Sequence, residues 1–264
     1  MTFDLSPLER ELEAWHRAEL TLPIWWRDDD AVDRTLQLDQ LISLSDRVGL
    51  PVHLAVIPRD ARQELADRLP DHMIPVVHGW AHFSHAPKDE KKAEFGPHRS
   101  PEAMLNDAHT GIARLRDLFG KALCPIFVPP WNRISHDILP GLGNLGFRAV
   151  STFTPRNTPV AAPDLLQINT HLDPIDWRGS RSLADPAHLV EQLVLQLQDR
   201  RYGRADNDEP YGLLTHHLVH DQQIWAFSEA VLERLMAGPV RPWALPSTAA
   251  LKASARYARH QDEE

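Results

Sequence analysis

The 264-residue sequence contains one cysteine and no apolar run approaching the roughly 18–20 residues that a membrane-spanning helix needs. Cys124 alone cannot form an internal disulfide, which excludes a disulfide-stapled fold. A net charge of −9 leaves no basic excess, so we expect neither nucleic acid nor a membrane as a partner. The N-terminal stretch MTFDLSPLERELEAW has no apolar segment of the secretory type, and we therefore predict a cytoplasmic location.

Histidine is the abundant reactive residue, with 15 copies against three tyrosines. It is the commonest metal ligand and the usual acid or base near neutral pH. Hydrophobic residues (42%) and charged residues (25%) have the balance of an ordinary globular protein. The length suffices for a full core, and neither a break in composition nor an internal repeat divides the chain. We predict a single domain over residues 1–264, with a polar tail from about 241 to 264.

Apolar runs alternate with amphipathic stretches along the chain, which predicts an α/β fold. Several of the apolar runs are continuous, and this pattern indicates a parallel sheet covered by helices. Seven strands fit either a barrel-like closure or an open doubly wound sheet. The predicted strands are 22–27, 51–58, 73–79, 124–130, 147–152, 165–172 and 211–217, and the predicted helices are 6–20, 33–47, 60–69, 101–119, 135–145, 186–200 and 222–236.

Polar clusters follow five of the predicted strands, at the ends where parallel α/β folds place their functional sites. They are RDDD at 27–30, HGWAHFSH at 78–85, PPWNR at 129–133, HLDPIDW at 171–177 and THH at 215–217. Random placement of polar residues would scatter some of these clusters to the other ends of the strands. We therefore expect the five segments to meet at one site.

The acidic run and the first histidine cluster together predict a metal site. Asp28, Asp29 and Asp30 repel one another, and a folded protein keeps them adjacent where a cation or hydrogen bonds offset the repulsion. A solvated turn is the other interpretation of such a run. His78 and His82 are four residues apart, and the glycine between them would let both face one ion. Two imidazoles with a carboxylate from Asp28 or Asp29 leave a position open for water, as in catalytic zinc sites.

The order of these motifs resembles that of the polysaccharide deacetylase superfamily of carbohydrate esterases, and the resemblance covers residues 22–220. It implies a distorted (β/α)7 barrel that holds one divalent metal ion. WRDDD looks like the aspartate pair of the family's first motif, which would make Asp28 the general base and Asp29 a metal ligand. HGWAH matches the second motif and would supply His78 and His82 as the other ligands. The ion is expected to be zinc, although cobalt and nickel suit the same donors.

The remaining motifs of the resemblance imply substrate contacts. FVPPWNR is similar to the family's groove-lining third motif, and DPIDW is a candidate for its Asp/Trp motif. The substrate-binding residues implied in this way are Pro130, Trp131, Asn132, Asp176 and Trp177.

The last motif of the resemblance concerns the catalytic acid. One departure from the family pattern concerns the arginine that holds the general base in place. GLLTHH is similar to the motif that ends in a catalytic histidine, so either His216 or His217 would protonate the leaving amine. The family has an arginine before the proline of its third motif, where this chain has Val128. Arg133 or Arg27 is expected to take the place of that arginine.

The resemblance implies a metal-dependent hydrolase of carbon–nitrogen bonds other than peptide bonds, with a small-molecule or oligosaccharide substrate. Deacetylation of an N-acetylated sugar is the leading expectation. Hydrolysis of a non-sugar amide or ureide is one alternative, and a catalytically silent carbohydrate-binding barrel is another. A structural zinc protein would add His85 as a fourth ligand. If Asp28 points away from the metal, binding without catalysis is favoured.

Overall fold

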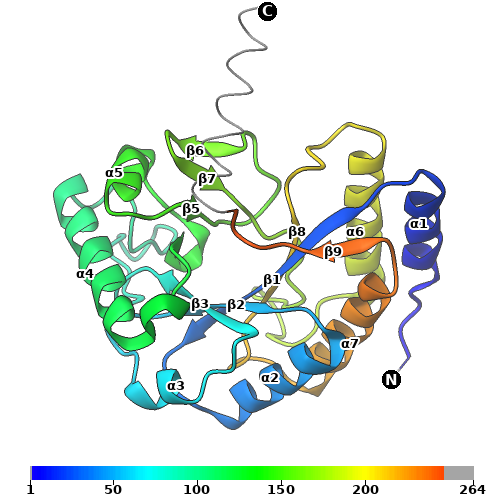
Figure 1. Ribbon diagram of the computed structural model, residues 1–264, viewed down its shortest axis with the longest axis horizontal. Coiled ribbons are helices and arrows are strands. Elements are labelled where there is room, and N and C mark those ends of the chain that lie inside the picture. The colour runs from blue at the N-terminus through cyan, green and yellow to red at the C-terminus, as the bar shows by residue number, and fades with distance from the viewer. Residues whose placement is uncertain (1, 247–264) are drawn as a thin grey trace, which may run out of the picture.

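The computed structural model describes residues 2–246, and its strands form a curled sheet with the helices arranged around it (Figure 1). The helices are α1 (Ser6–Arg17), α2 (Leu36–Val48), α3 (Gln63–Asp67), α4 (Pro101–Phe119), α5 (Leu139–Asn144), α6 (Pro186–Arg201) and α7 (Gln222–Met236). The strands are β1 (Leu22–Ala31), β2 (Val52–Val56), β3 (Met73–His78), β4 (Ile126–Val128), β5 (Ala149–Val150), β6 (Val160–Ala162), β7 (Leu165–Gln167), β8 (Tyr211–Thr215) and β9 (Val240–Pro242).

The sheet follows the strand order β6-β7-β5-β4-β3-β2-β1-β8, with β9 paired to β1. All pairs are parallel except β6 with β7. The chain beyond β7 reaches β8, where Leu172 forms a parallel bridge with Leu213 and its carbonyl accepts from the Leu214 N–H at 2.8 Å. This seam joins the two sides of the curled sheet. The predicted distorted (β/α)7 barrel is confirmed, and the seven predicted strands are the seven parallel strands that surround its axis.

Two apolar clusters lie on opposite faces of the strands because successive side chains of a strand alternate. The larger cluster combines outward residues such as Trp26 and Leu54 with the apolar faces of the surrounding helices. The smaller cluster contains no helical residue and fills the barrel interior. Its buried members are Trp25, Ala55, Val76, Ile126, Val128, Ala149 and Ile168. Apart from the buried His53, the interior is therefore apolar at the amino ends of the strands, which leaves the carboxyl ends for polar side chains.

Several element bounds differ from those predicted. Strand β1 continues to Ala31 and so includes the whole acidic run. The Pro-rich segment 153–163 contains β6, and the predicted polar tail contains β9, while residues 247–264 lie outside the described residues. No helix between residues 2 and 246 has the length and apolar character that a membrane span requires.

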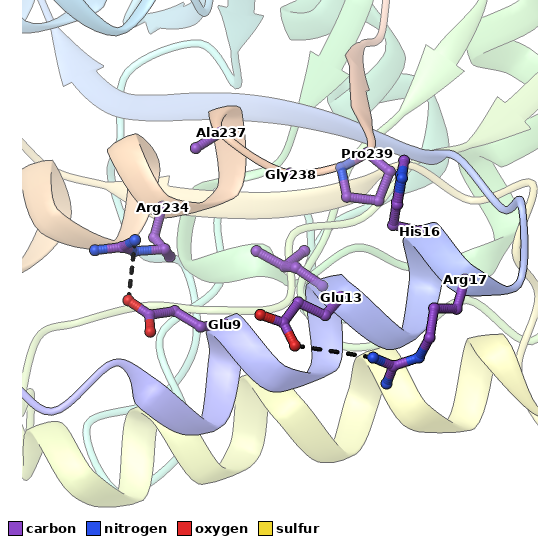
Figure 2. Close-up of a pocket in the computed structure, with 9 residues that line it drawn as sticks. Glu9, Glu13, His16, Arg17, Arg234, Ala237, Gly238 and Pro239 are labelled. Atoms are coloured by element: carbon purple, nitrogen blue, oxygen red, sulfur yellow. Dashed lines mark ion pairs between the residues drawn. The ribbon is translucent and has the colours of Figure 1, made fainter.

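The N-terminal helix α1 is an addition to the barrel, and it packs against α6 and α7. A hollow of about 710 Å³ lies between α1, the end of α7 and Pro239, and Figure 2 shows the residues that line it. Ion pairs cross or border it, from Arg234 to Glu9 and from Arg17 to Glu13. None of the predicted site residues lies in this hollow, so we assign it to the packing of α1.

His53 makes folding stability depend on pH. It is 1% exposed in β2, with its ring 5.3 Å from the ring of Trp25, and burial lowers its pKa to about 4. The unfolded chain takes up this proton near pH 6.5, so stability is full above that value and falls as the pH drops toward 4. Between pH 7.5 and 5.0 we expect His53 to remove about 2 kcal/mol from the free energy of unfolding.

Urea unfolding at the two pH values measures this effect. In His53→Gln the polar side chain no longer titrates, and the pH-dependent loss of stability is expected to shrink by the same amount. An identical pH dependence in the wild type and the variant would contradict the assignment.

Candidate active site

The acidic run lies at the carboxyl end of β1, where a bulge changes the direction of the side chains. The pairing of β1 with β2 shifts register between Asp28 and Ala31, and Asp30 has a φ of 77°. Regular alternation places Arg27 and Asp29 on the interior face and Asp28 on the outer face. The left-handed backbone conformation of Asp30 then turns the Asp30 carboxylate toward the interior as well. Asp29 and Asp30 consequently line one cavity of about 970 Å³, and Asp28 does not.

Three donor atoms converge at the wall of this cavity. The Asp30 Oδ1 atom lies 3.1 Å from His78 Nε2 and 3.2 Å from His82 Nε2. Two ligand atoms bound to a tetrahedral zinc at 2.0–2.1 Å stand roughly 3.4 Å apart, so the observed spacing suits one shared cation. Both histidines of the predicted set belong to this group, together with Asp30 where the sequence suggested Asp29. His85, the fourth ligand of the structural-zinc alternative, is not part of the group.

The contacts of His78 require a positive charge at this point. Its Nδ1 donates to the Val128 carbonyl oxygen at 3.0 Å, which leaves Nε2 facing the Asp30 carboxylate. A neutral imidazole would then place a lone pair against a carboxylate oxygen, so the contact requires a second proton or a metal ion. Burial disfavours the charged form, but the Asp29 and Asp30 carboxylates raise the pKa of His78 above its ordinary value. Burial alone would raise the pKa of Asp30, but the hydrogen bond and charge of His78 hold this pKa well below its usual range.

Asp29 is held by a buried guanidinium from its own strand. Arg27 donates to both carboxylate oxygens, from Nε at 2.9 Å and from Nη2 at 3.0 Å. The same guanidinium also donates to Ser151 Oγ and to Asn132 Oδ1, both at 2.7 Å. Arg27 is fully buried, so these partners compensate its charge and fix its plane. Of the two arginines predicted to replace the family's tether, Arg27 occupies the position beside a carboxylate, while Arg133 donates to the Lys92 carbonyl.

Asp28 faces the opposite side of β1 and contacts residues at the end of β8. Its carboxylate accepts from the Thr215 hydroxyl at 2.6 Å, from the His217 N–H at 3.0 Å and from His217 Nδ1. Burial is outweighed by the His217 imidazole and these hydrogen bonds, which lower the pKa of Asp28. Asp28 and His217 therefore tie β1 to the turn after β8, outside the cavity. His216, the residue before His217, lines the cavity with its ring 4.7 Å from the ring of Trp177.

The loop that carries His82 is supported by a buried carboxylate. Glu94 is 1% exposed and accepts from the Trp80 N–H at 3.2 Å and the Ala81 N–H at 2.7 Å. Burial raises the pKa of Glu94 above its ordinary value. Sequence reasoning missed this residue, because nothing in the charged run KDEKKAE marks which member turns inward.

Gly79 lets this loop pass between Glu94 and Pro130. The glycine has a φ of 55°, and an added Cβ would lie 2.6 Å from Pro130 Cδ and would also strike the Glu94 carboxylate. We expect Gly79→Ala to cost about 3 kcal/mol in the free energy of unfolding and to displace His78 and His82, which flank it. Gly49→Ala is the matched control, because Gly49 has a φ of 70° with no atom within 4 Å of its added Cβ. Equal effects of the two substitutions would show that the close approach is unimportant.

The predicted substrate-contact residues divide into two groups. Trp131, Asn132 and Trp177 line the cavity. Pro130 is instead buried and packs against the loop at Gly79. Asp176 accepts from the Gly179 and Ser180 N–H groups, both at 3.0 Å, and so shapes the loop that follows it.

Asp173 is a further carboxylate that lines the cavity. It accepts from Trp177 Nε1 at 2.7 Å, and burial raises its pKa despite the nearby charge of His216. It therefore lies close to the acid candidate and holds the indole that contacts it.

Left-handed backbone is concentrated around the cavity. Five of the eight non-glycine residues with positive φ between residues 2 and 246 line it, namely Asp30, His82, Trp131, Asn132 and Arg181. Such conformations cost roughly 1–3 kcal/mol each, and they persist where the surrounding structure imposes them. This concentration is typical of a functional site.

Comparisons with solved structures agree on the architecture. The fold matches a peptidoglycan N-acetylglucosamine deacetylase solved with a naphthalenyl N-hydroxybenzamide (15% identity, 86% of this chain, 87% of the other, TM-score 0.53). It also matches the peptidoglycan deacetylase PdaC from Bacillus subtilis (12% identity, 92% and 95%, TM-score 0.51) and a CE4 esterase from Streptococcus mutans (10% identity, 86% and 85%, TM-score 0.51). The chain has the polysaccharide deacetylase fold.

This deacetylase fold is shared at low identity, so the comparison concerns the architecture. No protein-family model matches the sequence, and no curated protein matches it. The chemistry must therefore be argued from the side chains of the cavity.

Proposed function

We propose that this chain is a metal-dependent hydrolase that removes the acyl group from an N-acylated amino sugar, with an N-acetyl group as the simplest case. The observation that carries the proposal is the convergence of Asp30, His78 and His82 on one point of the cavity that also contains Asp29 and His216. A metal site, a tethered carboxylate and a free imidazole in one cavity are the parts that amide hydrolysis requires.

The metal ligands in this proposal are Asp30, His78 and His82. Two imidazoles and one carboxylate are donors that zinc accepts, and they leave a position open to the cavity. A bound divalent cation would polarise the acyl carbonyl and acidify a water molecule. The assignment moves the ligand role one residue along the chain from the Asp29 suggested by the sequence.

Asp29 is the general base in this scheme. It faces the cavity beside Asp30, and the bidentate contact with Arg27 fixes the direction of its carboxylate. It would take the proton of the attacking water as the new C–O bond forms. Asp28, whose orientation was expected to decide between catalysis and binding, does point away from the site. Asp29 lies in the cavity at the position expected for the general base, a role that the resemblance gave to Asp28. The geometry therefore still favours catalysis over a silent binding barrel.

The remaining steps use the loop after β4 and the turn after β8. Pro129 and Pro130 have no N–H, and the Asn132 N–H donates to the Pro129 carbonyl at 3.0 Å, so Trp131 supplies the free N–H of that loop for the developing oxyanion. His216 would donate a proton to the nitrogen as the C–N bond breaks. The products are a carboxylate and the free amine of the sugar.

Acetate release from N-acetylglucosamine oligosaccharides tests the proposal. We expect treatment with a chelator to lower turnover at least about 100-fold, and added Zn²⁺, Co²⁺ or Ni²⁺ to restore it. Full turnover after elemental analysis confirms removal of the metal would contradict the metal's role. Release of ammonia from ureides in place of acetate from sugars would favour the non-sugar alternative.

A further inference from the structure

Four basic side chains surround the mouth of the site cavity. Lys92 lies on the loop before α4, Arg133 follows β4, and Arg178 and Arg181 lie on the loop before α6. The whole chain has the opposite balance, with 37 acidic residues against 28 basic ones. The cations are therefore concentrated at this cavity against the overall charge of the molecule.

None of these four side chains forms an ion pair with a carboxylate in residues 2–246, although most arginines elsewhere in that range do. Arg133 donates instead to the Lys92 carbonyl at 2.7 Å. The Arg181 guanidinium stands 5.6 Å from the Trp177 ring centre, and Lys92 Nζ stands 5.9 Å from that of Trp131. Their charges consequently remain uncompensated by the protein.

The carboxylates that line the cavity already have partners within the protein. Asp29 is paired with the buried Arg27, and Asp30 is shared between His78 and His82. Asp173 accepts the indole N–H of Trp177. A divalent ion at Asp30 would add further positive charge. The cavity therefore has unpaired positive charge at its mouth, and an anionic group would complement it.

A single tryptophan side chain separates Lys92 from His82, and another separates Arg181 from His216. Trp131, beside Lys92, has its ring 4.4 Å from the ring of His82. Trp177, beside Arg181, has its ring 4.7 Å from the ring of His216. A group attached to the sugar at some distance from its amide would reach them while the amide lies at the metal ligands.

From this arrangement we propose that the substrate is an N-acylated amino sugar that also carries a carboxylate or phosphate, which Arg178 and Arg181 bind with help from Lys92 and Arg133. This inference rests on the proposed function and specifies its substrate class. Guanidinium groups bind both anions through two parallel hydrogen bonds. Lys92, Arg178 and Arg181 are exposed, and solvent partly screens their charges. We therefore expect a moderate preference, about tenfold to 100-fold in kcat/KM.

Three sugars with the same ring test the proposal: N-acetylglucosamine, its 6-phosphate and its 6-carboxylate. The two charged sugars should have at least tenfold higher kcat/KM than the neutral one, and the preference should shrink in 0.5 M salt at about a 4 Å screening length. The larger of the two charged values identifies the anion. In the double variant Arg178→Gln/Arg181→Gln, the ratio of charged to neutral kcat/KM should fall toward 1. Arg47→Gln is the control, since Arg47 pairs with Glu229 on the outer helices and should leave the ratio unchanged.

The outcomes separate this inference from the function on which it rests. Equal kcat/KM for neutral and charged sugars would overturn the inference and leave the deacetylase proposal standing. If no sugar releases acetate, the proposed function fails, and calorimetric binding of the three sugars then decides the inference. Tighter binding of the charged sugars that disappears in the double variant would support it, and equal binding would overturn it.

Discussion

Replacing Asp29 with asparagine is expected to lower kcat about 10³-fold while the bound metal remains in place. A positioned general base contributes about 10²–10⁴-fold, and the amide cannot accept the proton of the attacking water. Asparagine keeps the size of the side chain and an oxygen for Arg27, so the ligands Asp30, His78 and His82 should not move. The measurements are kcat for acetate release and zinc content per chain by elemental analysis.

Asp28→Asn is the matched control for this prediction. Asp28 is as buried as Asp29 and accepts from a ring nitrogen of His217, as Asp29 accepts from Arg27, so both variants should lose stability by about 3 kcal/mol. Only Asp29→Asn should lose turnover by more than tenfold. If Asp28→Asn loses turnover about 10³-fold and Asp29→Asn stays near wild type, Asp28 is the base, as the motif alone suggests.

Replacing Asp30 with alanine is expected to remove the metal and to abolish measurable turnover. Changes in groups that only orient a ligand cost about 10–100-fold in affinity, and the loss of one of three ligands should cost more. His78→Ala and His82→Ala should behave in the same way. Zinc titration of the three variants beside Asp29→Asn measures the effect. Full zinc content in Asp30→Ala would contradict the assignment of this carboxylate.

The barrel could be predicted from the sequence because its strands are continuous apolar runs separated by amphipathic helices. Such runs leave few alternatives, since strands buried on both faces must lie in a covered parallel sheet. Helix α4 was predicted with its observed bounds, 101–119. The short strands β6 and β9 were missed because three residues with mixed burial give no clear periodicity.

The convergence of the two histidines could be predicted from the sequence, but the carboxylate that meets them could not. Strand β1 was expected to end at Arg27 because polar residues follow. The strand instead continues to Ala31, and the side chains of Arg27 and Asp29 lie inside the barrel. Alternation from the apolar part of β1 would have placed these two residues on one face. The bulge at Asp30 depends on a left-handed backbone conformation that a run of three aspartates does not reveal.

The roles of the two adjacent histidines depend on contacts distant in sequence. His217 turns away from the cavity because Asp28, 189 residues earlier, accepts its N–H and its imidazole proton. The cations at the cavity mouth come from loops whose course no local pattern specifies. In both cases the chemistry was visible in the sequence, and the placement required the fold.

An anomalous difference map of zinc-loaded crystals, recorded above the zinc absorption edge, tests the account most directly. We predict one strong peak at about 2.0–2.2 Å from Asp30 Oδ1, His78 Nε2 and His82 Nε2, with Asp29 next to it and still paired to Arg27. A peak bound by Asp28 or Asp29 in place of Asp30, or the absence of a peak between the two histidines, would contradict the central claim.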